Sequence, residues 1–172
     1  MEATRARIVE AACRLLASGG FGVFTIDTVA RAADVSRMTV YNQFGSRSGL
    51  LEAIFDWVAE RGQVRRLGEA ADLPQFVRAC CALWTSNRTV HRRLVGLAAI
   101  DPDFGAALAG RERRRAESAR ALLAGCTEAA VRRVLALTGF ASVDALAGAD
   151  DPLAAADLVQ ALVERALAWE PN

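Results

Sequence analysis

The sequence predicts an all-α protein, and three observations support this fold class. Alanine and leucine, which are strong helix formers, dominate a composition that is 53% hydrophobic and only 6% aromatic. The prolines lie at positions 74, 102, 152 and 171, where helices can begin or end. Apolar residues recur at helical spacing, and no segment alternates in polarity as a half-buried strand does. A chain of 172 residues with this apolar fraction can form a substantial buried core.

The first helix is expected over residues 3–18, and the glycine pair at positions 19–20 should end it. Phe21 and Phe24 follow and are expected to fill the small core beside this turn. The apolar face of the helix has the spacing i, i+4, i+7 and i+8 and contains Ile8, Ala12, Leu15 and Leu16.

Residues 25–44 indicate two short helices separated by a tight turn at residues 34–36. Thr25 is suited to cap the first of these helices, and Asp27 in its first turn is favoured by the helix dipole. Ser36 is suited to cap the second. The second helix then carries polar and basic side chains on a stiff rod: Arg37, Thr39, Tyr41, Asn42 and Gln43. A helix-turn-helix of this kind places its second helix in the DNA major groove.

After a break at residues 45–46, a long helix is expected over about residues 47–66. Its buried stripe consists of Leu50, Leu51, Ile54, Phe55 and Val58. The remaining helices are expected over about residues 74–86, 89–100, 103–124, 127–147 and 153–169. We therefore expect a helix-turn-helix DNA-binding domain over residues 1–46 and a second helical domain over residues 47–172.

Charge is unevenly distributed along the chain, although the net charge is only +1. Residues 1–50 contain six arginines and four acidic residues, a net charge of +2. No acidic residue occurs between Asp34 and Glu52, whereas Arg37 and Arg47 lie inside that gap. A protein face without carboxylates can approach DNA phosphates, and we expect this segment to form such a face.

The four cysteines, at positions 13, 80, 81 and 126, form no C-x-x-C pair, and we expect them to be buried and reduced. His91 and the cysteines lack the spacing of a zinc site, so no metal or other cofactor is expected. No signal peptide is visible, and no apolar run approaches the ~18 residues that would span a bilayer. We expect a soluble, cytoplasmic protein without a membrane partner.

The segment from Phe24 to Leu51 resembles the tetracycline-repressor (TetR) family of transcriptional regulators. The resemblance lies in its sequence, FTIDTVARAADVSRMTVYNQFGSRSGLL, and in the order of the helices around it. Over the rest of the chain it extends to the number of helices and to short phrases such as Arg92-Arg93-Leu94. It implies an N-terminal helix-turn-helix domain that binds DNA and a C-terminal helical domain that binds a ligand and dimerises.

In this family the third helix enters the major groove, so the resemblance implies that five side chains contact base edges: Arg37, Met38, Thr39, Asn42 and Gln43. Arginine can bond to guanine with two hydrogen bonds, and asparagine or glutamine to adenine. Methionine and the threonine methyl can contact a thymine methyl. The DNA-binding set also includes Thr25, Ser36, Tyr41 and Arg47. For Thr25 and Ser36 a role as helix caps alone stays open. Arg47 lies in the first turn of a helix, where a nearby anion such as a DNA phosphate would be favoured.

Four positions depart from the family's usual pattern. Asp34 replaces a turn glycine but can still adopt a left-handed conformation. Met38 replaces a frequent glycine, Gln43 a common histidine and Arg47 the usual lysine. None of these changes removes DNA binding, but Met38, Asn42 and Gln43 should alter which bases are preferred.

The last two helices form the dimer interface in this family, which implies a homodimer through residues 127–147 and 153–169. Their residues at helical spacing are Val131, Val134, Leu135, Thr138, Ser142, Leu158, Leu162, Ala166 and Trp169. A two-fold dimer presents two recognition helices one DNA turn apart, which implies a near-palindromic double-stranded DNA operator.

The resemblance also implies a pocket for an unknown small-molecule effector among the helices over residues 47–124. An apolar or aromatic effector would suit its expected lining of Phe55, Phe76, Cys80, Trp84 and Leu97, although an apolar residue at helical spacing is more often plain core. Residues 91–93 and 111–115 are expected to form solvated charged faces, with an acidic-ligand site as the alternative for residues 91–93.

A ligand-responsive repressor is therefore the leading interpretation. A helical small-molecule sensor with a degenerate DNA-binding head is one alternative, and a redox-responsive regulator that uses Cys80 and Cys81 is another. An enzyme lacks support, because no carboxylate pair, nucleophile-base set or phosphate loop stands out.

Overall fold

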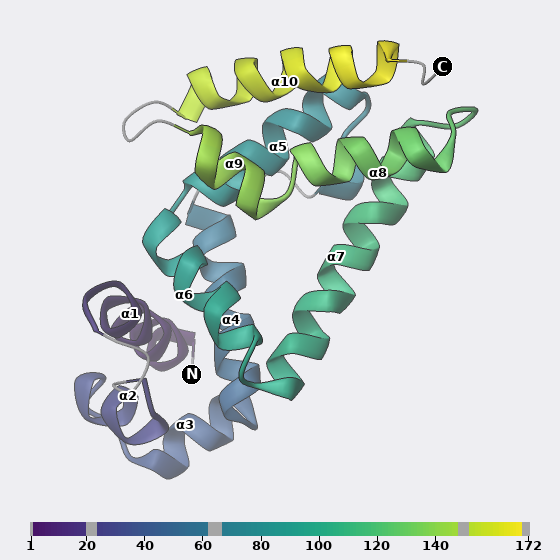
Figure 1. Cartoon of the computed structure of the whole chain (residues 1–172). Coiled ribbons are helices and arrows are strands. Elements are labelled where there is room, and N and C mark those ends of the chain that lie inside the picture. The colour runs from purple at the N-terminus through teal and green to yellow at the C-terminus, as the bar shows by residue number, and fades with distance from the viewer. Residues whose placement is uncertain (1, 20–23, 62–66, 148–151, 170–172) are drawn as a thin grey trace. The chain divides into compact units, whose positions relative to one another are not determined.

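The computed structural model describes residues 2–19, 24–61, 67–147 and 152–169, and these residues form helices and no strand (Figure 1). The elements are α1 (Glu2–Ser18), α2 (Ile26–Ala32), α3 (Arg37–Phe44), α4 (Arg47–Arg61), the 3₁₀ turn η2 (Leu67–Glu69), α5 (Leu73–Thr85), α6 (Arg88–Ala98), α7 (Pro102–Leu122), α8 (Glu128–Leu137), α9 (Phe140–Leu146) and α10 (Pro152–Ala168). The predicted all-α fold class is confirmed. Within the described ranges, no helix has both the length and the apolarity to cross a membrane.

Packing divides the chain into two compact units. The first unit contains residues 1–58 and 87–109, and the second contains residues 59–86 and 110–172. The division falls within α4 and within α7. The boundary predicted at residues 46–47 separates the helix-turn-helix from the rest by function, and it stays a prediction.

In the first unit, α1 packs against α2 and α6, and α2 packs against α3. The apolar stripes expected for α1 and α4 lie in the core of this unit, apart from Leu15, which is half-buried. Phe24 is buried as expected, whereas Phe21 lies outside the described residues. The fully buried side chains include Ile8, Val29, Val40, Leu50, Ile54, Leu94 and Phe104.

Two helix caps and one left-handed residue form the helix-turn-helix. Thr25 and Thr28 form a reciprocal cap: the Thr25 hydroxyl accepts from the Thr28 N–H at 3.2 Å, and the Thr28 hydroxyl accepts from the Thr25 N–H at 3.0 Å. Asp34 adopts the expected left-handed conformation with φ of 52°. Ser36 then caps α3 by accepting from the Thr39 N–H at 3.0 Å. The turn therefore needs no glycine.

A glycine is required where α3 meets α4. A Cβ atom at Gly49 would lie 2.2 Å from the carbonyl oxygen of Phe44, which is closer than real contacts allow. Because Gly49 has no side chain, the first turn of α4 can approach the last turn of α3. This close approach sets the short connection between the two helices.

In the second unit, α10 packs against α5, α8 and α9, and α5 also packs against α9. The core of this unit is apolar and includes the fully buried side chains of Phe76, Val77, Cys80, Val134, Val143, Val159 and Val163. Each of these helices therefore contributes an apolar face to one core.

The single helix expected over residues 127–147 is wrong, because the chain breaks at Thr138-Gly139 and forms α8 and α9. Side chains also donate to carbonyl oxygens at the end of α8, where no further helical turn forms. Ser142 donates its hydroxyl to the Ala136 carbonyl at 2.7 Å, and Trp84 donates its Nε1–H to the Thr138 carbonyl at 3.0 Å. These side-chain donors replace the backbone bonds that a continuous helix would make.

Candidate nucleic-acid interface

Helix α3 presents half of its eight side chains to solvent. Arg37, Met38, Tyr41 and Asn42 are exposed, and only Val40 is buried. Met38 is 66% exposed and Tyr41 is 40% exposed. Thr39 and Gln43 are half-buried. The predicted base-contacting residues therefore share one short accessible helix, and their contact with DNA stays a prediction.

The hydroxyls of Thr25 and Ser36 are engaged in capping. Besides their bonds to backbone N–H groups, the Ser36 hydroxyl lies 2.8 Å from the Thr39 hydroxyl, and the Thr25 hydroxyl lies 3.1 Å from that of Thr28. The cap role of Thr25 and Ser36 is confirmed. A hydroxyl in such a pair can still bond to a phosphate, so their DNA contacts stay predictions.

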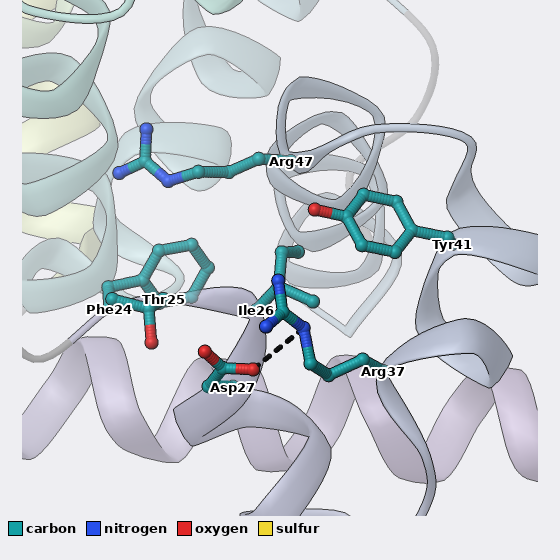
Figure 2. A pocket seen from close by; sticks show the side chains of 7 residues that line it. All are labelled: Phe24, Thr25, Ile26, Asp27, Arg37, Tyr41 and Arg47. Atoms are coloured by element: carbon teal, nitrogen blue, oxygen red, sulfur yellow. Dashed lines mark ion pairs between the residues drawn. The ribbon is translucent and has the colours of Figure 1, made fainter.

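An open pocket of about 380 Å³ lies beside α3, and Figure 2 shows its side chains converging from three helices and the segment before α2. It is lined by Phe24, Thr25, Ile26, Asp27, Arg37, Tyr41 and Arg47. Four of the nine predicted DNA-binding residues therefore meet here, from α3, α4 and the segment before α2. Two arginines and the carboxylate of Asp27 therefore face the same pocket.

The guanidinium of Arg37 is paired with Asp27 from the first turn of α2. Arg37 Nε lies 2.8 Å from Asp27 Oδ1, and the contact crosses the pocket in Figure 2. Both side chains are more accessible than buried, so the pair contributes little to stability. The sequence predicts for Asp27 only that it complements the dipole of α2. Because Asp27 and Arg37 are ten positions apart, no local sequence pattern indicates their ion pair.

Arg47 already has an anionic partner within the chain. Its Nη1 donates to Asp101 Oδ2 at 2.6 Å, and its guanidinium lies 5.7 Å from the centre of the Phe24 ring. The expected anion near this cation is therefore present, as a carboxylate. The expected face without carboxylates is wrong, since Asp27 and Asp101 come to it from outside the acid-free segment. A phosphate contact for Arg47 stays a prediction.

Arg5 is a contributor that sequence reasoning missed. It extends from α1 and donates through Nη1 to the Gln43 carbonyl at 2.6 Å, while its guanidinium lies 4.4 Å from the centre of the Phe44 ring. A cation at the C-terminus of a helix is favoured by the helix dipole. Arg5 therefore holds the end of α3, and no local pattern could have indicated this because 38 residues separate the partners.

Two of the predicted effector-lining residues belong to the first unit. Phe55 and Leu97 are both buried, and the Phe55 ring meets the His91 ring edge to face with centroids 5.4 Å apart. His91 is fully buried, and Arg93 donates to the Gly19 carbonyl. The expectation of a solvated face over residues 91–93 is therefore wrong for these two residues, because both are engaged with the rest of the unit.

The other three predicted effector-lining residues, Phe76, Cys80 and Trp84, are buried in the second unit. Trp84 packs edge to face against Phe140, with ring centroids 5.6 Å apart. Burial fits both a pocket lining and plain core. Their role in binding an effector stays a prediction.

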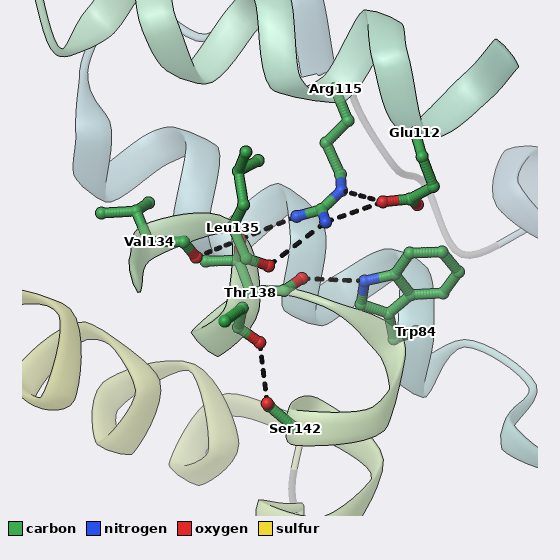
Figure 3. Close-up of polar contacts among 8 residues, drawn as sticks. Trp84, Glu112, Arg115, Val134, Leu135, Thr138 and Ser142 are labelled. Carbon is green, nitrogen blue, oxygen red and sulfur yellow. Dashed lines mark hydrogen bonds and ion pairs between the residues drawn. The ribbon is translucent and has the colours of Figure 1, made fainter. Parts of the chain in front are cut away.

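A buried arginine of α7 bonds to the end of α8 in the second unit (Figure 3). Arg115 is only 7% exposed, so the solvated face expected over residues 111–115 is wrong at this position. Its Nε and Nη2 donate to Glu112 Oε2 at 3.0 and 2.8 Å, and Nη1 donates to Thr138 Oγ1 at 2.8 Å. Nη2 also donates to the Leu135 carbonyl at 3.2 Å. The charge is therefore stabilised by a carboxylate and by the end of α8.

The cysteines do not form a reactive pair. Burial raises the pKa of Cys80 to about 12, against the opposing effect of Arg115, and burial raises the pKa of Cys81 to about 11. The thiolate is the reactive form of cysteine, so these thiols are unreactive near neutral pH. This disfavours a redox role for Cys80 and Cys81. Cys13 is buried as expected, whereas Cys126 is exposed, contrary to expectation.

Comparisons with known proteins agree with this geometry. Residues 8–54 match the family described as bacterial regulatory proteins, tetR family. The HTH-type transcriptional regulator AlkX of Mycobacterium tuberculosis is 41% identical over 64 residues, which is 35% of this chain and 30% of AlkX. The match therefore spans about a third of that relative's length.

Two solved structures share the fold over nearly the whole chain. GusR of Salmonella enterica has a TM-score of 0.63 and 21% identity, over 94% of this chain and 95% of GusR. NalD of Pseudomonas aeruginosa has a TM-score of 0.66 and 24% identity, over 96% of each chain. Residues 8–54 therefore match the tetR family of bacterial regulatory proteins in sequence, and the chain shares its helical fold with GusR and NalD.

Proposed function

We propose that this protein is a ligand-responsive DNA-binding transcriptional regulator, a repressor that leaves its operator when a small molecule binds. The observation that carries the proposal is the exposed row of polar and basic side chains on α3, next to a pocket lined by Arg37 and Arg47. Regulation is the role of the family, so we infer no enzymatic activity. The protein acts in the cytoplasm, where its DNA operator lies.

Base recognition is assigned to α3. Arg37 bonds to a guanine, Asn42 and Gln43 bond to adenines, and Met38 and the Thr39 methyl contact thymine methyls. Thr25, Ser36, Tyr41 and Arg47 surround α3 and contact phosphates. Phosphate contacts set the register on the duplex, whereas base contacts give specificity.

The acting form is a homodimer formed through α8 and α10. The exposed side chains of Leu158 and Trp169 on or beside α10 support this assignment. In contrast, Val131, Val134 and Thr138 are buried within a single chain and are not available to a partner. Two copies place their α3 helices about 34 Å apart, one turn of DNA, so the operator is a near-palindrome.

The effector binds in the helical domain over residues 47–172 and is apolar or aromatic. The buried aromatic side chains of Phe76 and Trp84 support this ligand class. NalD, which shares the fold, is described as the secondary repressor of a multidrug efflux pump. An effector that prefers the form with low DNA affinity weakens DNA binding. By thermodynamic linkage, DNA weakens effector binding by the same factor.

Selection from a random-sequence duplex library tests the DNA-binding assignment. We expect the protein to enrich a near-palindromic sequence and to bind it at least a thousandfold more tightly than a shuffled duplex. Affinity for both duplexes should fall as salt rises, because Arg side chains displace counterions from phosphates. A protein that enriches no sequence and binds both duplexes equally at low salt would be a helical sensor with a degenerate DNA-binding head.

A thermal-shift screen against apolar and aromatic compounds tests the effector assignment. A true effector should raise the melting temperature of the free protein and release the enriched duplex over the same concentration range. A compound that stabilises the protein but leaves the duplex bound is not the effector.

A further inference from the structure

The ion pair between Asp27 and Arg37 joins the two helices of the helix-turn-helix at the edge of the pocket (Figure 2). Asp27 lies in the first turn of α2, and Arg37 is the first residue of α3. The side chains are 50% and 62% exposed respectively, and Arg37 Nε lies 2.8 Å from Asp27 Oδ1. The acidic side chain of Asp27 therefore contacts Arg37, the residue to which we assign the guanine contact.

Helix stability does not account for this pair. Thr25 and Thr28 already cap α2, and Ser36 caps α3. An ion pair between two side chains as accessible as these contributes little to folding. Its effect must therefore be sought in what the Arg37 guanidinium can bind.

The carboxylate changes Arg37 in two ways. It contacts the Nε side of the guanidinium, so the two terminal Nη groups keep the geometry for two parallel bonds to guanine O6 and N7. It also places a negative charge where a DNA phosphate would otherwise bind the same guanidinium, and like charges repel each other there. The first effect favours a base contact, and the second disfavours a backbone contact.

We infer that Asp27 is a specificity-determining positioning residue, which orients Arg37 toward a base edge and lowers its affinity for phosphates. The inference rests on the proposed function, because it presupposes that α3 binds DNA. Asp27 lowers the total affinity for DNA of any sequence and raises the ratio between operator and non-operator binding.

The test compares Asp27→Asn with the wild type on two duplexes, the one enriched by the wild type and a shuffled duplex of the same composition. Asparagine keeps the size of the side chain and removes its charge. We expect the shuffled duplex to bind more tightly and the ratio of the two affinities to fall by roughly tenfold. The salt slope on the shuffled duplex should steepen by about one, because Arg37 gains a phosphate. Asp27→Ser, which also removes the carboxylate, should give the same change in ratio.

Asp34→Asn is the matched control. Asp34 is an exposed acid of the same helix-turn-helix, and asparagine also tolerates its left-handed conformation. This variant should strengthen binding to both duplexes by the same factor. In an Arg37→Ala background, Asp27→Asn should leave the ratio unchanged, because the side chain it positions is absent.

The inference is overturned if Asp27→Asn changes both affinities by one common factor, or if it changes the ratio equally with and without Arg37. The first result would mean that Asp27 acts only through its charge, and the second that it acts independently of Arg37. The proposed function fails by a different result, namely a wild-type protein that enriches no sequence from the library. The two failures are therefore distinguishable.

Discussion

Arg47 lies at the start of α4, where the helix dipole opposes a positive charge. The Asp101 carboxylate supplies the compensating negative charge at 2.6 Å, and both side chains are partly buried. The Phe24 ring covers the guanidinium from another side. A DNA phosphate that binds Arg47 must therefore share it with Asp101 or displace Asp101.

Cysteine reactivity is also decided at the scale of single residues. Alkylation by iodoacetamide at pH 7 should modify Cys126 first, because it is exposed while Cys80 and Cys81 are buried with raised pKa values. Peptide mass spectrometry over time measures this order. Cys126→Ser should abolish the fast phase. Rapid labelling of Cys80 or Cys81 in the folded protein would restore the redox hypothesis.

The same two thiols predict a pH dependence of stability. Their pKa values are raised in the folded state from 9.0 to about 12 and about 11, so the unfolded chain loses its thiol protons first as the pH rises. Their contribution to stability is therefore complete below pH 9 and is lost between about pH 9 and pH 12. Urea denaturation across this range measures the loss. A double variant, Cys80→Ala with Cys81→Ala, should lose less stability over the same interval.

At the scale of helices, Asp101 links the starts of α4 and α7. One carboxylate oxygen accepts from Arg47, and the other accepts from the Phe104 N–H at 3.1 Å and caps α7. A movement of the α7 start therefore changes the surroundings of Arg47. This gives the pocket residue Arg47 a direct connection to a helix outside the helix-turn-helix.

Substitutions at Asp101 should separate its two roles. Asp101→Asn keeps the cap and weakens the bond to Arg47, whereas Asp101→Ala loses both. Loss of the cap costs about 1 kcal/mol, so the free energy of unfolding should fall in the order wild type, Asp101→Asn, Asp101→Ala. Chemical denaturation gives these values. Equal stability of the two variants would show that the cap contributes nothing.

The end of α8 depends on Arg115 from α7. Its guanidinium satisfies the Leu135 carbonyl and the Thr138 hydroxyl, and Trp84 satisfies the Thr138 carbonyl (Figure 3). The helix therefore ends where side chains from α5 and α7 provide donors. The position of α9 follows from this break.

Arg115→Met should lower the free energy of unfolding by about 3 kcal/mol, because it leaves buried acceptors without donors. Urea denaturation measures the change. Glu112→Gln is the control on the same network: Glu112 is 43% exposed, so its charge should contribute less than about 1 kcal/mol. A loss as small as that of Glu112→Gln would mean that water replaces the arginine.

At the scale of the whole molecule, DNA binding as proposed requires two copies of the chain. The first unit contains the helix-turn-helix, and the second contains α8 and α10, which the proposed dimer uses. The apolar side chains of Leu158 and Trp169 remain 44% and 57% exposed in a single chain. Burial of such side chains against a partner is favourable.

Leu158→Glu should convert the dimer to a monomer, because it places a charge in the proposed interface. Analytical ultracentrifugation measures the mass, and affinity for the enriched duplex should fall with it. Ala17→Glu, at an exposed position of α1, is the control and should remain dimeric. A dimer that persists in Leu158→Glu would exclude this face of α10 as the interface.

The sequence by itself determined the helices, their caps and the helix-turn-helix. Thr25 and Ser36 cap residues three positions ahead, and the left-handed conformation of Asp34 depends on its own backbone. The stripes of α1 and α4 follow from helical spacing. Such features involve residues within a few turns of one another, so a local sequence pattern is enough to predict them.

Only the tertiary structure decided which partners the arginine side chains bind. Arg47 meets Asp101 across 54 positions, Arg5 reaches Gln43 across 38, and Arg115 reaches Thr138 across 23. These partners depend on how the helices pack, and no local periodicity records that packing. For the same reason the break between α8 and α9 was not foreseen, because its donors come from α5 and α7.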